Sequence, residues 1–110
     1  MSIVQTAKKL KESFDVPVTD LDSIELINEK GIYQVFEGAN KGKLFFGIYL
    51  AFKTLRVGGL DEAYKEIDNL LLKIQNRNEE CGGVAVESVN LVRFSERFFI
   101  YHIRVNMVEV

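Results

Sequence analysis

The sequence predicts an α+β domain with a mainly antiparallel sheet of four to five strands, an N-terminal helix and one long central helix. Three observations predict this fold class. Two apolar segments flank a glycine-rich turn within residues 32–55, apolar residues recur at helical spacing over 60–77, and a second pair of alternating segments fills 84–110. The order is helix, hairpin, helix, hairpin. At 110 residues the chain is expected to form a single domain, residues 1–110.

The first segment predicts a helix over about 3–14. Ser2 and Gln5 have the spacing of a capping box, which satisfies unpaired backbone groups at a helix start. Pro17 restricts Val16 to extended conformations, so the helix must end before it. A narrow apolar stripe consists of Ile3, Ala7, Leu10 and Phe14.

The acidic segment 19–30 has little periodicity, which predicts a loop with a short edge strand around 24–27. After it, 32–38 and 43–55 read as two strands of a hairpin. The glycine-rich sequence between them offers three residues suited to positive φ: Gly38, Asn40 and Gly42. Because both faces of the second strand are apolar, it is expected to lie centrally in the sheet.

The clearest helix follows the hairpin, within residues 56–78. Asp61 can cap it and Glu62 suits its positive end, while Lys73 and Arg77 suit its negative end. Leu72 falls outside the apolar stripe and is expected to be exposed. The expected buried stripe consists of Leu60, Ala63, Tyr64, Ile67, Leu70, Leu71 and Ile74.

The chain closes with strands over 84–94 and 97–110, joined by a tight turn at Ser95 and Glu96. The odd positions of the last strand, from Phe99 to Met107, are all apolar and should face the core. Its even positions are apolar at both ends and polar in the middle, which is unusual for a solvated face. Either a helix or a neighbouring subunit is expected to cover these ends. The candidate interface residues are Phe98, Ile100, His102, Arg104, Asn106 and Val108, together with Leu72.

Composition excludes several classes of function. The net charge is −2 with both signs spread along the chain, so no direct nucleic-acid partner is expected. Cys81 is the only cysteine and His102 the only histidine, which leaves no disulfide and no zinc-type metal site. Residues 1–14 do not resemble a signal peptide. The longest apolar run is far below the roughly 20 residues that span a bilayer, so no membrane association is expected.

No motif for catalysis or cofactor binding emerges. A catalytic pair of Cys81 and His102 has no supporting motif, so a structural role fits both residues better. The glycines before the central helix lack the Lys and Ser/Thr of a phosphate-binding loop. The acids in 19–25 lack the glycine and the final glutamate of a calcium loop. We therefore assign no catalytic, cofactor or metal site and expect a binding protein that is not an enzyme.

The chain resembles the tail terminator, or tail completion, proteins of tailed bacteriophages and related minor tail and neck proteins. The resemblance rests on the order of four segments, "IVQTAKKLKESF", "KLFFGIYLAFKT", "GGLDEAYKEIDNLLLKIQNR" and "VNLVRFSERFFIYHIRVNMVEV". It implies a homo-oligomeric ring, typically a hexamer, that caps the tail tube and contacts tail tube protein and head connector protein. It also implies a place in the virion tail or neck after assembly in the host bacterial cytoplasm. The alternative is a small dimeric α+β module that binds a ligand or regulates a partner.

Overall fold

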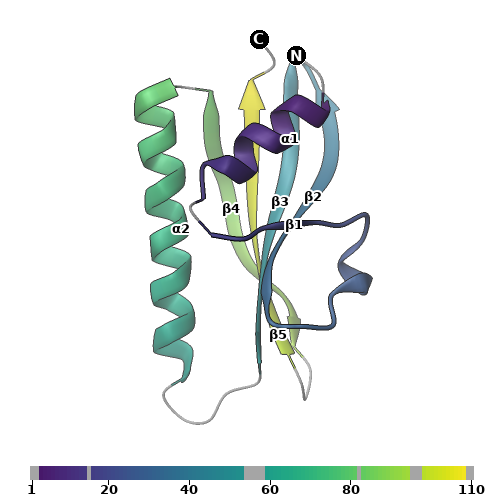
Figure 1. Cartoon of the computed structure of the whole chain (residues 1–110), viewed down its shortest axis with the longest axis vertical. Helices are drawn as coiled ribbons and strands as arrows, with labels where there is room; N and C mark the ends of the chain where they lie inside the picture. The colour runs from purple at the N-terminus through teal and green to yellow at the C-terminus, as the bar shows by residue number, and fades with distance from the viewer. Residues whose placement is uncertain (1–2, 15, 54–58, 82, 95–97, 109–110) are drawn as a thin grey trace.

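The computed structural model describes residues 3–14, 16–53, 59–81, 83–94 and 98–108 (Figure 1). It shows an α+β fold with two helices and a five-stranded sheet, as the sequence predicts in outline. In chain order the elements are α1 (Ile3–Glu12), β1 (Thr19–Asp20), the 3₁₀ turn η1 (Ile24–Leu26), β2 (Gly31–Asn40), β3 (Lys43–Lys53), α2 (Gly59–Cys81), β4 (Val84–Phe94) and β5 (Phe98–Val108).

The strand order is β1-β2-β3-β5-β4, and all neighbours are antiparallel except β1 and β2. The parallel strand β1 was not predicted. The expected strand at 24–27 is wrong, because η1 occupies this place and the Ser23 hydroxyl accepts a hydrogen bond from Glu25 N at 3.3 Å. This local capping bond satisfies the backbone without a sheet neighbour.

The central hairpin is tighter than the sequence suggests. Its turn consists of Lys41 and Gly42, with φ of 51° and 77°, as a two-residue hairpin loop requires. Gly38 also has positive φ but lies inside β2, next to a register shift, while Asn40 keeps negative φ. The expected turn at Ser95 and Glu96 and the cap at Ser2 fall outside the described residues.

The main core lies on the face of the sheet that both helices cover, here called the front face. In Figure 1, α1 crosses the strands at their upper end and α2 runs beside them. Leu72 is 55% exposed, as predicted, whereas Tyr64 is 48% exposed and does not belong to the buried stripe. Tyr64 lies at the flank of α2, where its ring contacts the ring of Tyr101 edge-on. The helix residues in this core are Leu10, Ala63, Ile67, Leu70 and Ile74.

A second, smaller core lies on the opposite face, here called the back face. Ile27 packs there with Tyr49, Ala51 and Ile100, and the partly buried Leu21, Ile24, Tyr33 and Val35 surround them. Residues 21–27 therefore cover the part of the back face around Ile100. The rest of this face holds the candidate site.

Candidate functional site

The structure does not bring the predicted interface residues together on one exposed surface. Ile100 is 1% exposed, so the chain itself already covers one apolar end of the even face of β5. His102 and Arg104 lie side by side on the back face, with side chains 13% and 44% exposed. Leu72 lies on the exposed side of α2, away from them. Asn106 is buried, and the side chains of Phe98 and Val108 lie outside the described part of the chain.

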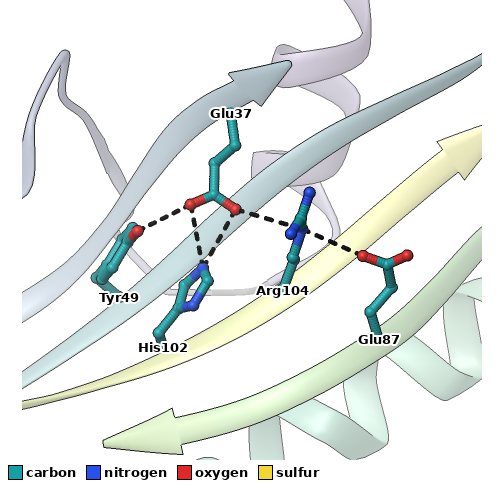
Figure 2. A network of polar contacts seen from close by, with 5 residues as sticks. All are labelled: Glu37, Tyr49, Glu87, His102 and Arg104. Atoms are coloured by element: carbon teal, nitrogen blue, oxygen red, sulfur yellow. Dashed lines mark hydrogen bonds and ion pairs between the residues drawn. The ribbon is translucent and has the colours of Figure 1, made fainter. Parts of the chain in front are cut away.

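A polar cluster of Glu37, Tyr49, Glu87, His102 and Arg104 occupies the centre of the back face (Figure 2). Nε2 of His102 lies 3.2 Å from both carboxylate oxygens of Glu37. The Tyr49 hydroxyl donates a hydrogen bond of 2.9 Å to Glu37 Oε2. One carboxylate from β2 thus contacts both β3 and β5.

Arg104 links this carboxylate to a second one. Its Nε lies 3.9 Å from Glu37 Oε1 and 3.1 Å from Glu87 Oε2. Neither contact is a hydrogen bond, since the buried Nε has no hydrogen-bond partner among the described residues. The contacts are therefore ion pairs, and the guanidinium also lies over the Phe45 ring, 4.9 Å from its centroid.

Two β-bulges bring the acids into the polar cluster. In β2, Phe36 pairs with Phe46 and Gly38 with Phe45, so Glu37 is an extra residue. In β4, the register shifts between Val86 and Ser88, so Glu87 is extra as well. A bulge bends its strand and redirects a side chain, which is how two flanking strands direct carboxylates toward β5.

Gly47 provides the space below the polar cluster. A Cβ on Gly47 would lie 2.7 Å from His102 Nε2, 2.7 Å from Tyr49 Cε2 and 2.8 Å from Glu37 Oε2. The missing side chain lets the rings of Tyr49 and His102 stack, with centroids 4.6 Å apart and an interplanar angle of 17°. The sequence alone gives no signal for this role, because the three contacts come from three different strands.

The electrostatics fix the protonation of two groups. Burial acts to raise the pKa of Glu37, but hydrogen bonds from His102 and Tyr49 and attraction to His102 and Arg104 outweigh it, so this pKa lies below its ordinary value. Burial and the hydrogen bond to Glu37 raise the pKa of Tyr49 well above its ordinary value. At neutral pH the carboxylate is a weak base and the phenol a weak acid. The arrangement is better suited to holding strands and orienting Arg104 than to transferring protons.

Other candidate sites stay without geometric support. The described residues contain no group of three or more His, Cys, Asp or Glu side chains placed to hold a metal ion. Within its described residues, neither helix has the length and apolar character needed to span a bilayer. Glu62 lies in the first turn of α2, as the sequence predicts, but Asp61 lies inside this turn and does not cap the helix, which begins at Gly59. Lys73 and Arg77 lie before the last turn, because the helix continues to Cys81. The side chain of Cys81 lies outside the described part of the chain.

Two comparisons with known proteins found no relative of this chain. No protein-family model matches the chain, and a search of curated proteins found no matching sequence.

Proposed function

We propose that this chain is a structural protein of a phage or prophage virion, which assembles into a ring that caps the tail tube and helps join the tail to the head. The observation that carries the proposal is a row of exposed apolar side chains on an edge strand of the sheet that the described residues form. The row lies on β4 and consists of Val86, Val89, Leu91 and Val92.

Edge strands normally carry features that prevent pairing with another chain, such as lysine, proline, bulges or short length. β4 has 11 residues and contains no lysine or proline, although bulges interrupt it. Single exposed apolar residues are common, but a row of them on an open edge indicates a contact surface. This supports self-assembly as the function of the edge.

A ring gives such an edge a defined role. Heterologous contacts between identical copies close into a ring when their rotation matches the number of subunits. The completed ring presents one face to the tail tube, and its occupancy of the tube end stops further polymerisation. The resemblance in element order supports this role, with tail tube protein and head connector protein as partners.

Sizing by light scattering and negative-stain imaging, with and without the cognate tail tube protein, tests the proposal. We expect rings, either from the chain alone or at tube ends, and loss of rings in Val89→Asp and Leu91→Asp. Leu26→Asp is a matched control, because Leu26 is an exposed leucine on η1, away from β4. A chain that neither forms rings nor binds tube ends would contradict the proposal.

The same edge also supports a second candidate, the small dimeric module. Two copies of β4 could pair antiparallel about a two-fold axis, and centring this pair on Asn90 would place Glu87 opposite the position of Arg93. Such a protein would form dimers that do not grow with concentration. The same sizing measurement distinguishes a stable dimer from a ring.

A further inference from the structure

An open groove lies at the other edge of the sheet, between α1, β1 and β2. Its volume is about 580 Å³, and residues from α1 and β2 supply its apolar wall. Ile3, Val4 and Phe36 in this wall are exposed. The groove is therefore an apolar surface beside a sheet edge that β1 covers only in part.

Strand β1 leaves much of β2 without a neighbour. It pairs with Tyr33 and Gln34, and the next bond is Leu21 N to Gln34 O at 2.9 Å. Beyond this point no described strand pairs with the outer side of residues 35–40. These residues, here called the open half of β2, offer backbone groups to an added strand.

A buried polar group in the groove also lacks a partner. Gln34 is 1% exposed and uses Nε2 to donate to Ala7 O at 3.1 Å and to Asp20 Oδ1 at 3.3 Å. Its Oε1 accepts no hydrogen bond from any described residue. A buried acceptor without a donor is costly, so an occupant that brings an N–H or O–H group would stabilise the groove.

Strand β4, at the opposite edge of the sheet, is at the same level along the strands as the open half of β2 and runs antiparallel to it. One row across the sheet consists of Ala39, Leu44, Met107 and Val84. The first half of β4 therefore lies level with the open half of β2. Three antiparallel pairings separate the two strands, so a copy placed alongside in the same orientation would bring β4 antiparallel to β2.

The front faces of the two edges also match in polarity. Val86 and Val89 pair with core residues of β5, and Phe36 pairs with Phe46 in the same core, so all three lie on the front face. Glu37 and Glu87 lie on the back face. Joining the edges would therefore place apolar residues beside apolar ones on the front face, while the two carboxylates on the back face each have Arg104 of their own chain as a counter-ion.

We propose that β4 of one copy adds to the open half of β2 of the next copy, with its front-face side chains in the groove under α1. This head-to-tail contact rests on the proposed self-assembly and names the surfaces that perform it. Each copy uses two different edges, so the same contact repeats around a ring.

Mixing two edge variants tests this contact. The β4 variant is Val86→Asp with Val89→Asp, and the groove variant is Val4→Asp with Phe36→Asp. Each variant alone should be monomeric, with an apparent self-association constant at least tenfold below that of the unmodified chain. A 1:1 mixture should give heterodimers by native mass spectrometry, because the intact groove of the first variant accepts the intact β4 of the second. Leu26→Asp should assemble like the unmodified chain.

The controls keep each outcome decisive. Circular dichroism shows whether each variant folds, and Val4→Asp alone replaces the double groove variant if needed, because Val4 is 78% exposed. A groove variant that still dimerises would overturn the contact in favour of β4 pairing with β4. A mixture that stays monomeric, or an unmodified chain that is monomeric at about 1 mM, would also overturn it. The assay contains no tail protein, so failure of the tube-capping role leaves its result unaffected.

Discussion

Gly47 lies below side chains that come from three strands and has none of its own. His102, Tyr49 and Glu37 all approach the position that its Cβ would occupy. Their mutual contacts depend on this space, because an added methyl group cannot share it with three neighbours. The arrangement of the polar cluster therefore depends on the absence of a side chain at Gly47 as well as on the charged groups.

Gly47→Ala should therefore disturb the whole polar cluster. We expect a loss of about 1–3 kcal/mol in the free energy of unfolding, typical of overpacking, measured by urea denaturation. Gly31→Ala is the matched control, since a Cβ there would meet its nearest neighbour at 3.4 Å, an ordinary contact. Equal effects of the two substitutions would show that Gly47 has no special role.

Glu37→Gln keeps the shape of the side chain and removes its charge. The lowered pKa of Glu37 means that its ionised form stabilises the fold above the unfolded pKa of about 4.3, and that this contribution is lost as pH falls through the folded pKa. We expect Glu37→Gln to cost about 1 kcal/mol at pH 7 and less at about pH 3. Chemical denaturation of both proteins at the two pH values measures this, and a pH-independent difference would contradict it.

Tyr49→Phe tests the other partner of the same carboxylate. Because the folded-state pKa of Tyr49 is raised, its contribution is complete below the unfolded pKa of about 10 and is lost as pH rises above it. The unmodified chain should lose more stability than Tyr49→Phe between about pH 9 and pH 11. Thermal melts of both proteins across this range give the comparison, and parallel curves would count against the hydrogen bond.

The polar cluster as a whole could not be predicted from the sequence. His102 and Arg104 were singled out because their spacing places them on one face of one strand. Glu37 and Glu87 were missed because each lies at a bulge, where the period of two breaks. Which strands lie next to one another depends on tertiary structure, which local patterns do not contain.

At the scale of elements, residues 21–27 replace the cover that the sequence assigned to a helix or a second subunit. Leu21 and Ile24 surround a small core formed by Ile27, Tyr49, Ala51 and Ile100. An apparently featureless acidic segment thus supplies apolar side chains to the back face. Its path is fixed by one backbone bond to β2 and by the cap of η1.

Ile100→Ala tests how much the small core under residues 21–27 contributes to stability. Truncating a buried isoleucine typically costs about 2–5 kcal/mol, and we expect a loss in that range by urea denaturation. Leu91→Ala should cost less than about 1 kcal/mol, because Leu91 is half-exposed on β4. A small effect of Ile100→Ala would mean that residues 21–27 do not pack on it in solution.

Elements with strong local periodicity were the predictable ones. The two helices, the hairpin and the closing strands follow patterns that lie within each segment. Strand β1 and η1 follow no such pattern, since β1 exists through its pairing with Tyr33 and Gln34, far along the chain. The exposure of Tyr64 was missed because the stripe of α2 is narrower than helical spacing alone indicates.

At the scale of the whole molecule, the two edges of the sheet differ. One is the full-length strand β4, and the other is β2, which β1 covers over two residues.

This difference between the two edges predicts a hydrogen-exchange pattern. Amides in 35–40 and 84–88 should gain protection together as protein concentration rises, whereas amides of η1 should not. Mass spectrometry of labelled peptides measures this, and protection of 84–88 alone would indicate β4 paired with itself.

Strand β1 has a consequence for the geometry of assembly. It occupies the edge of β2 at Tyr33 and Gln34, so only the first half of an incoming β4 can pair with that edge. In the proposed contact this limit fixes the position of each copy along the strand direction of its neighbour. A fixed height with no axial step is the condition under which identical subunits close on themselves instead of spiralling into a fibre. The two residues of β1 would then determine whether the copies close into a ring or grow into a fibre.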